Sequence, residues 1–190
     1  MPPALRLYTM QTAIFGGGCF WCTEAVFQTL DGVKKVVSGY MGGDQKHPTY
    51  MEISNGDTGH AEVIQIDFDE TKISFSELLL VFFKTHNPTL LNRQDTDRGT
   101  QYRSVVFYST EEQKKQTENI IDQLSRDNIF DKPIITELNP VSEFYDAEDY
   151  HQDYFRKNHD KPYCSFVIQP KLDKFVQEFK DKIKPEFLGD

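Results

Sequence analysis

The order of secondary-structure elements along the chain predicts a mixed α/β fold built from two layers. The clearest strand covers residues 61–68, where apolar and polar side chains alternate, whereas residues 19–30 repeat apolar side chains at helical spacing. A second helix is expected at residues 74–86, because Ser74 and Glu77 open it in capping-box spacing. Further strands are expected at residues 11–16, 33–40 and 102–109. The front of the chain therefore has the order β-α-β-β-α-β, which is the split βαβ arrangement. We predict an α/β (α+β) two-layer sandwich of ferredoxin-like type.

The segments that follow this core are expected to decorate it. Thr110 and Gln113 open a polar-faced helix that runs to about residue 128. A strand, a short helix and a last strand are expected at residues 134–138, 147–157 and 164–168. A charged amphipathic helix then covers about residues 171–184. We interpret the acidic segment 146–154 as a solvated helix start, because carboxylates are favoured near a helix N-terminus.

Length and composition indicate one globular domain. A chain of 190 residues can bury a substantial core, and we expect a single domain over residues 1–190 with its core at about 11–168. The hydrophobic content of 38% and aromatic content of 13% are those of a folded protein. The formal net charge of −9 argues against non-specific nucleic-acid binding, which needs a basic surface.

The sequence also predicts a cytoplasmic protein. No apolar stretch approaches the roughly 20 residues that a membrane span requires. The first ten residues contain two prolines and no continuous apolar segment, unlike a signal peptide. Three cysteines do not make a disulfide scaffold, and they fit a reducing compartment in which cysteines are more often catalytic than structural.

The most informative motif is Cys19-Phe20-Trp21-Cys22, which follows three glycines and opens an expected helix. The free N–H groups and positive dipole end of a helix favour a thiolate at Cys19. The aromatic pair would form an apolar wall beside this nucleophile, and Cys22 lies within one helical turn, close enough for a disulfide. The spacing alone also suits buried core cysteines, a redox pair or half a zinc site. The glycines favour a reactive pair, because they let ligand atoms approach the backbone closely.

Glu62 is a candidate acid at the start of the strand at residues 61–68. It shares a strand face with Ile64 and Ile66, so it lies at the rim of an apolar layer if that face is the core face. Burial there would raise its pKa and favour the neutral, hydrogen-donating form. The alternative is that Glu62 lies in water at a frayed strand end and titrates normally. The turn at residues 56–60 favours a position at the edge of a site.

Other polar residues give weaker signals. Any single tyrosine is more often a packing residue, and this applies to Tyr50 and Tyr102, although Tyr102 shares strand parity with Ser104, consistent with an inward-facing hydroxyl. Asp97 lies in a polar turn, where turn chemistry explains an aspartate without any function. The five histidines are scattered and no second CxxC motif is present, so no metal site is expected.

Taken together, these motifs resemble the A-type peptide methionine sulfoxide reductases. The resemblance runs in order and at compatible spacings over roughly residues 13–164. Its matching segments are Gly18-Cys19-Phe20-Trp21, Gly39-Tyr40-Met41-Gly42-Gly43, Pro48-Thr49-Tyr50, residues 56–62 and 99–104, Phe144-Tyr145, Ala147-Glu148 and His151-Gln152. The resemblance implies an oxidoreductase that reduces the S epimer of methionine sulfoxide, free or in proteins, and so repairs oxidative damage.

The resemblance also implies roles for the candidate residues. Cys19 would attack the sulfoxide sulfur and be left as a sulfenic acid, while Phe20 and Trp21 hold the S-methyl group. The positions of Tyr50, Glu62 and Tyr102 match those that hydrogen-bond the sulfoxide oxygen, with Glu62 as the proton donor. Asp97 matches an active-site aspartate that positions the substrate or holds the local network. No bound cofactor is implied, and we expect a monomer.

A second thiol must then resolve the sulfenic acid, and here the chain departs from the commonest family pattern. That pattern has glycine at position 22 and a resolving cysteine in a flexible C-terminal tail, whereas this chain has Cys22. Cys164 lies near the expected tail position, but an apolar run and an expected helix follow it, which favours a packed, structural residue. We therefore prefer Cys22 as the resolving residue, with Cys164 as the alternative. Thioredoxin, or dithiothreitol in vitro, would return the disulfide to thiols.

Two other classes of protein remain as alternatives. A thioredoxin-like disulfide oxidoreductase also uses CxxC at a helix N-terminus, but its pair usually encloses small residues, whereas Phe20 and Trp21 would crowd a protein disulfide. A zinc or interaction module is weakened by the lack of further ligands. Turnover of a methionine sulfoxide substrate with dithiothreitol separates the three classes.

Overall fold

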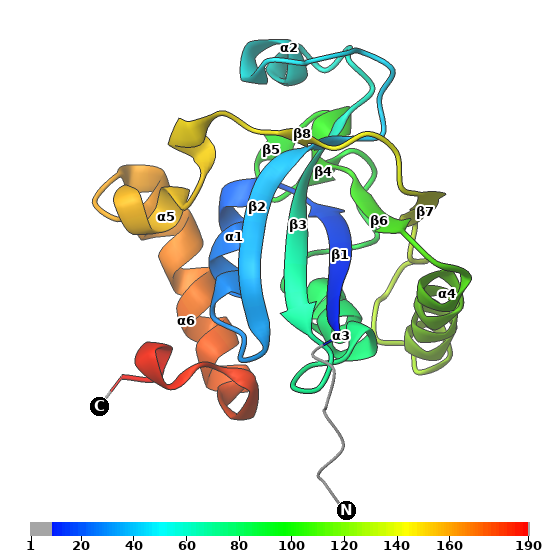
Figure 1. The fold of residues 1–190 in the computed structure, drawn as a ribbon, viewed down its shortest axis with the longest axis vertical. Coiled ribbons are helices and arrows are strands. Elements are labelled where there is room, and N and C mark those ends of the chain that lie inside the picture. The colour runs from blue at the N-terminus through cyan, green and yellow to red at the C-terminus, as the bar shows by residue number, and fades with distance from the viewer. Residues whose placement is uncertain (1–8, 190) are drawn as a thin grey trace, which may run out of the picture.

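The computed structural model describes residues 9–189; the expectation that the N-terminus is not a signal peptide falls mostly outside this range. A six-stranded sheet has the order β7-β6-β1-β3-β2-β8 (Figure 1). Every neighbouring pair is antiparallel except β6 and β7, which are parallel. The strands are β1 (Met10–Gly17), β2 (Val33–Met41), β3 (Ala61–Asp69), β6 (Ser104–Tyr108), β7 (Glu137–Pro140) and β8 (Tyr145–Asp146).

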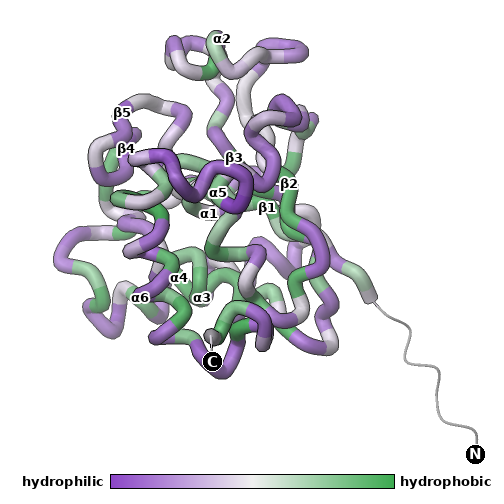
Figure 2. Tube along the Cα trace, turned by 90° about the vertical axis from the view of Figure 1, so that its left-hand side faces the viewer, coloured by the Kyte–Doolittle hydropathy of each residue, from purple (hydrophilic) through white to green (hydrophobic). Residues whose placement is uncertain are grey.

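The four inner strands and two helices confirm the predicted ferredoxin-like fold. Strands β6, β1, β3 and β2 lie side by side, and helices α1 (Phe20–Gln28) and α3 (Phe75–Thr85) make the two crossovers behind them (Figure 1). Phe15 of β1 marks the centre of the core, with ring centroids 5.8 Å from Phe27 of α1 and 4.9 Å from Phe82 of α3. Figure 2 shows apolar residues along the strands and α3 and hydrophilic residues along the outer loops.

Local capping explains where the predicted helices begin. Ser74 accepts a hydrogen bond from the Glu77 N–H while the Glu77 carboxylate accepts one from the Ser74 N–H, a capping box that starts α3 as expected. Thr110 caps α4 (Glu111–Arg126) by accepting a bond from the Gln113 N–H. Both helix starts were predicted from these residue types.

Two short elements near the site were not predicted. Thr49 and Glu52 form a second capping box at the start of α2 (Tyr50–Asn55), beyond the end of the sheet. Strands β4 (Arg93–Gln94) and β5 (Asp97–Arg98) form a small hairpin, so Asp97 starts a strand and does not lie in the turn itself. The spacing of Thr49 and Glu52 is the sequence signal that identifies α2.

The C-terminal third differs most from the prediction. The helix expected at 147–157 is divided into a 3₁₀ turn (Asp149–His151) and α5 (Tyr154–Lys157), because Asp153 between them has a left-handed φ of 57°. The strand expected at 164–168 is wrong: Cys164–Ile168 is a π-helical turn that continues into α6 (Gln169–Glu178). The buried residues in this run have helical spacing, which overrides the local strand propensity: Cys164, Ile168, Leu172 and Phe175.

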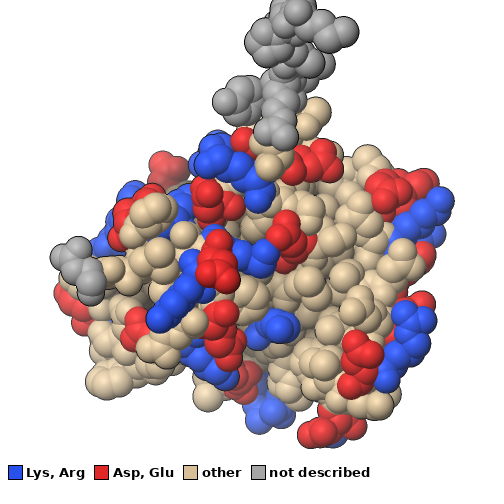
Figure 3. All heavy atoms as spheres, turned by 90° about the horizontal axis from the view of Figure 1, so that it is seen from below, with Lys and Arg blue, Asp and Glu red and all other residues tan. Residues whose placement is uncertain are grey.

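The remaining boundaries shift by a few residues. The strand expected at 134–138 is β7, which begins three residues later at Glu137. The C-terminal helix α6 ends at Glu178, and a 3₁₀ turn (Lys180–Lys182) covers the rest of the expected helix. Figure 3 shows acidic and basic side chains intermingled on one face of the molecule. Within residues 9–189, no helix combines the length and apolar character needed to cross a membrane.

Candidate active site

The start of α1 places Cys19 at the N-cap of the helix, as the sequence predicts. The backbone reaches this position through Gly18, whose φ of 95° lies in a region that favours glycine. A Cβ at Gly18 would also lie 2.8 Å from the Gln94 side chain, so glycine is needed for close packing against the hairpin. The Cys22 N–H donates to the Cys19 carbonyl oxygen at 3.1 Å, which closes the first turn and brings both thiols to one end of the helix.

Glu62 lies directly beside this helix start. Its side chain is only 2% exposed, and its Oε2 accepts a 3.0 Å hydrogen bond from the Phe20 N–H. Burial raises the pKa of Glu62 to about 8, although the Phe20 hydrogen bond opposes that rise. The alternative of a solvated, normally titrating Glu62 is therefore wrong. A carboxyl with this pKa is mostly neutral at pH 7 and can donate a proton.

The cysteine pair differs from the simple helix-dipole expectation. Burial, the hydrogen bond with Cys22 and the charge of Glu62 raise the pKa of Cys19 well above its ordinary value. The Phe20 N–H, which would otherwise favour a thiolate, is already bonded to Glu62. In contrast, the hydrogen bond with Cys19 lowers the pKa of Cys22, and the Lys171 charge lowers it further. The first-turn environment therefore shifts the pKa values of the two thiols in opposite directions, with that of Cys22 lowered and that of Cys19 raised.

Trp21 forms an aromatic wall next to the cysteines. Its indole stacks on Tyr154 with ring centroids 3.7 Å apart and planes 5° apart, and its Nε1–H donates to His151 Nδ1 at 3.0 Å. The Phe20 side chain is buried, 5.2 Å from the His151 ring and 5.7 Å from the Tyr40 ring. Trp21 is half-buried and can therefore face a ligand, whereas Phe20 supports the wall from behind.

His151 and Glu148 are residues that the sequence interpretation missed. The segment 146–154 was expected to be a solvated helix start, but His151 is fully buried and its ring lies 4.3 Å from that of Tyr50. Glu148 accepts hydrogen bonds from the Tyr40 hydroxyl at 3.0 Å and the Tyr50 N–H at 3.1 Å. The signal that could have found them is their place in the matched family motif.

Tyr50 and Tyr102 lie close enough to Glu62 for its charge to act on both phenols. Tyr50 is the first residue of α2, and burial followed by the Glu62 charge raises its pKa to about 12. Tyr102 lies in a 3₁₀ turn (Thr100–Tyr102) before β6, so the strand-parity argument for its hydroxyl is wrong. Burial and the charges of Glu62 and Tyr50 also raise the pKa of Tyr102. Both phenols thus remain protonated donors at neutral pH.

Asp97 connects to the cysteines through Tyr163. The Tyr163 hydroxyl donates to Asp97 Oδ2 at 3.0 Å, and its oxygen lies 3.8 Å from Cys22 Sγ. Burial raises the pKa of Asp97 and the Tyr163 hydrogen bond opposes that rise. The aspartate therefore has a specific partner near the site, beyond the turn chemistry expected from sequence.

Cys164 is fully buried against α1. It packs in a cluster with Ala25 and Ile168, and both Cys22 and Trp21 lie against this cluster. Burial raises the pKa of the Cys164 thiol. This is the packed environment that the sequence favours for it. No disulfide links the three cysteines in the structure.

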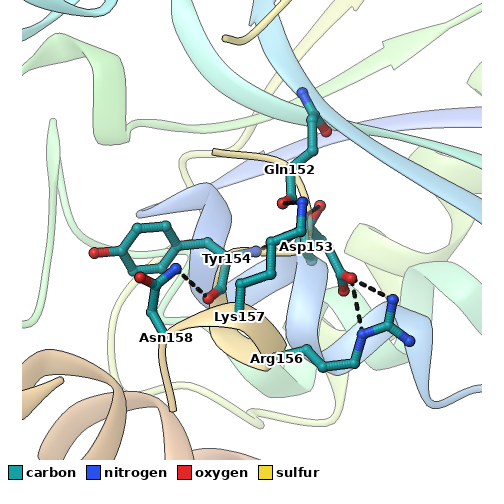
Figure 4. A network of polar contacts seen from close by, with 7 residues as sticks. Gln152, Asp153, Tyr154, Arg156, Lys157 and Asn158 are labelled. Atoms are coloured by element: carbon teal, nitrogen blue, oxygen red, sulfur yellow. Dashed lines mark hydrogen bonds and ion pairs between the residues drawn. The ribbon is translucent and has the colours of Figure 1, made fainter. Parts of the chain in front are cut away.

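A buried carboxyl of α1 holds the segment that bears Tyr154. Glu24 is 1% exposed and accepts the N–H groups of Asp153 and Tyr154 at 2.9 and 3.2 Å. Figure 4 shows two further hydrogen bonds within the same segment, from Lys157 Nζ to the Gln152 carbonyl and from the Asn158 amide to the Tyr154 carbonyl. Sequence spacing gave no sign of this role of Glu24. The stacking partner of Trp21 is thereby fixed from two sides.

Among the residues that the structure describes, no cluster of three or more histidine, cysteine, aspartate or glutamate side chains could hold a metal ion. The site instead brings together two thiols, one mostly neutral buried carboxyl, several phenols and an aromatic wall. Such a site can protonate a polar oxygen on one side while a thiol attacks from the other.

Comparison with known proteins assigns the family. The family model described as peptide methionine sulfoxide reductase matches residues 11–183. The chain belongs to this family. A protein from Acinetobacter baumannii named peptide methionine sulfoxide reductase MsrA is 55% identical over 177 residues, which cover 93% of this chain and 100% of that relative. Membership of the A-type reductases, an oxidoreductase family, confirms the resemblance found in the sequence.

Solved structures agree with this assignment. Mxr1 from Saccharomyces cerevisiae in reduced form aligns with a TM-score of 0.76 at 34% identity, over 82% of this chain and 89% of that one. Mxr1 in complex with Trx2 aligns with a TM-score of 0.55 at 25% identity, over 76% and 84% of the two chains. The fold of this reductase family therefore extends to the present chain.

Proposed function

We propose that this chain reduces the S epimer of methionine sulfoxide, in proteins and as the free amino acid, through a Cys19 sulfenic acid. The observation that supports this most directly is the pair formed by Cys19 and the protonated Glu62 at the start of α1. A sulfoxide sulfur becomes electrophilic when its oxygen is protonated, and a neutral buried carboxyl is suited to that task. The names of the A-type relatives support the choice of substrate.

In the proposed first step, Glu62 donates its proton to the sulfoxide oxygen while the Cys19 sulfur attacks the sulfoxide sulfur. The negative carboxylate formed at Glu62 can then accept the thiol proton of Cys19, so the step consumes no net proton. The bond between the two sulfurs and the sulfoxide S–O bond then break as the hydroxyl passes to the Cys19 sulfur, so methionine leaves as the thioether and Cys19 becomes a sulfenic acid. A raised thiol pKa is compatible with this order of events, because Cys19 ionises only as Glu62 loses its own proton.

The surrounding residues receive roles in substrate placement. The hydroxyls of Tyr50 and Tyr102 would hydrogen-bond the sulfoxide oxygen beside Glu62. Trp21, supported by Phe20, would contact the S-methyl group. Asp97 would hold the local network through Tyr163. Replacement of Cys19 by Ser should abolish methionine formation even in a single turnover, and methionine formed by that variant would refute the nucleophile assignment.

In the second step, Cys22 would attack the sulfur of the Cys19 sulfenic acid, forming the disulfide and releasing water. Three observations support Cys22 over Cys164: its place one turn from Cys19, its lowered pKa and the complete burial of Cys164. A thioredoxin would then reduce the disulfide, a proposal supported by the structural likeness to Mxr1 in complex with Trx2. No bound cofactor is needed in this cycle.

Thiol titration after one equivalent of methionine sulfoxide tests the resolving step. Cys22→Ser should retain the methionine burst but lose the intramolecular disulfide, whereas Cys164→Ser should behave as the wild type. A disulfide that persists in Cys22→Ser and is lost in Cys164→Ser would overturn the assignment. The single-domain organisation, the monomeric state and the cytoplasmic location stay predictions.

A further inference from the structure

A pocket reaches the cysteines on the side of α1 that faces α6. A pocket of about 320 Å³ is lined there by both Cys19 and Cys22. Glu62, Tyr50 and Tyr102 do not line it, so it approaches the thiols from a different side than the oxygen-binding residues. Lys171, in the first turn of α6, contributes its ammonium-bearing side chain to the same wall. The proposed mechanism gives no role to this pocket or to Lys171.

The β4–β5 hairpin orients two groups toward Cys22. Asp95, at the hairpin tip with a left-handed φ of 49°, forms an ion pair with Lys171 Nζ. Two residues later, Asp97 accepts the hydrogen bond from Tyr163, whose oxygen is 3.8 Å from Cys22 Sγ. One short hairpin therefore positions a cation and a phenol around the same sulfur. The Lys171 side chain is restrained by its partner, which reduces the entropy lost when it stays near a thiol.

The chemistry of the resolving step needs a thiolate at Cys22. The Cys22 sulfur donates an electron pair to the Cys19 sulfur, the S–S bond forms and the S–O bond of the sulfenic acid breaks. The departing hydroxide takes up a proton equivalent to the one that the Cys22 thiol lost on ionisation and leaves as water, so no further oxidant or reductant is required. A neighbouring ammonium group increases the thiolate fraction of a cysteine at neutral pH.

We propose that Lys171 is a positioning residue for the resolving step, holding Cys22 in its ionised form from the α6 side of the pocket. This inference rests on the proposed function, in which Cys22 is the resolving residue. The pKa of Cys22 is lowered first by the hydrogen bond with Cys19 and then by the Lys171 charge, which agrees with this role of the lysine. The Cys22 charge in turn raises the pKa of Lys171, after the hydrogen bond with Asp95, so the lysine stays cationic despite partial burial.

Several other charged and titratable groups lie around Cys22. Asp97 on the hairpin opposes ionisation of Cys22, and burial also opposes it. His86 of the segment after α3 is neutral, because burial lowers its pKa to about 4. The further groups that line the pocket or adjoin the thiols are Cys19 and Glu62 from α1 and β3, Lys84 from α3, and Lys174 and Glu178 from α6. The Lys171 charge is among the largest influences that lower the pKa of Cys22.

The test compares Lys171→Met with Lys174→Met in the full-length protein. Lys174 lines the same pocket one turn further along α6, so it is a matched control for loss of a lysine. Rapid-quench measurement after mixing with methionine sulfoxide separates the methionine burst from disulfide formation. Lys171→Met should slow disulfide formation about tenfold at pH 7 and shift its pH midpoint upward by about one unit, with an unchanged burst. Lys171→Arg should restore both quantities, and Lys174→Met should match the wild type.

A second measurement avoids turnover altogether. In a Cys19→Ser, Cys164→Ser background only Cys22 remains, and the pH dependence of its alkylation should shift upward with Lys171→Met but not with Lys174→Met. An unchanged disulfide rate and an unchanged alkylation midpoint in Lys171→Met would overturn the inference. Equal slowing by Lys171→Arg and Lys171→Met would also overturn it, because packing and not charge would then be responsible. If Cys22→Ser still forms the disulfide at the wild-type rate, the proposed function fails instead.

Discussion

Replacement of Glu62 by Gln separates proton donation from helix capping. The amide oxygen can still accept the Phe20 N–H bond that Glu62 accepts at 3.0 Å, so the start of α1 should remain in place. The variant loses the acidic proton, and general acid catalysis typically contributes about 10²- to 10⁴-fold. Because an amide still donates a weak hydrogen bond, we expect a loss of roughly 10²- to 10³-fold in methionine formation.

The pH dependence gives the sharper test. A carboxyl with a pKa of about 8 is roughly nine-tenths neutral at pH 7 and roughly one-tenth neutral at pH 9. Since the neutral form would donate the proton in the proposed mechanism, single-turnover methionine formation should fall by about tenfold per pH unit well above pH 8 if Glu62 alone limits the rate. Glu62→Gln should lack this alkaline decline.

The assay is rapid quench of the enzyme with excess methionine sulfoxide and no reductant, with methionine quantified over time. Asp69→Asn is the matched control, because Asp69 is a buried carboxyl at the opposite end of the same strand, β3. Its single-turnover rate should equal that of the wild type. A Glu62→Gln rate within twofold of the wild type, or an unchanged alkaline decline, would refute the proton-donor role.

Three further predictions concern the aromatic wall at Trp21, the hydrogen bonds of Glu24 that fix the stacking partner of Trp21, and the pH dependence of the stability of the fold. Trp21→Phe removes the bond to His151 Nδ1 and should raise KM about tenfold, with a smaller change in kcat. Glu24→Gln weakens the two bonds that fix the segment bearing Tyr154 and should lower the free energy of unfolding by about 1–2 kcal/mol in chemical denaturation. Because the pKa of Glu62 is raised from 4.5 to about 8, wild-type stability should fall as pH rises across that window, by at most about 5 kcal/mol, and Glu62→Gln should show a smaller fall.

The core of the fold could be predicted because period and capping agree there. Alternation over residues 61–68 placed Glu62 on the same face as Ile64 and Ile66, and the structure buries all three. Ser74 and Thr110 marked their helix starts through side-chain chemistry that acts within three residues. These signals act between residues close in sequence, so they can be recognised without knowledge of tertiary contacts.

The hydrogen bonds that hold the site residues in place could not be predicted in the same way, because they join residues that are far apart in the sequence. Glu24 and the N–H groups of Asp153 and Tyr154 are about 130 residues apart, and Trp21 and His151 are equally distant. The raised pKa of Cys19 also depends on tertiary structure, because burial raises it most and the Cys22 hydrogen bond and the Glu62 charge add to it. The helix-dipole expectation considered only the start of α1, whose Phe20 N–H is bonded to Glu62. The error at 164–168 arose because apolar and β-branched residues suit a strand locally but pack here at helical spacing.

The position of Trp21 has a practical consequence. The chain contains a single tryptophan, and that indole lies two residues from Cys19, stacked on Tyr154 and hydrogen-bonded to His151. Intrinsic fluorescence excited at the indole band therefore originates within the active site and nowhere else in the chain. In the proposed cycle, ligand contact, thiol ionisation and disulfide formation would all take place next to this one fluorophore. Trp21 fluorescence in the unlabelled protein therefore offers an optical test of that cycle.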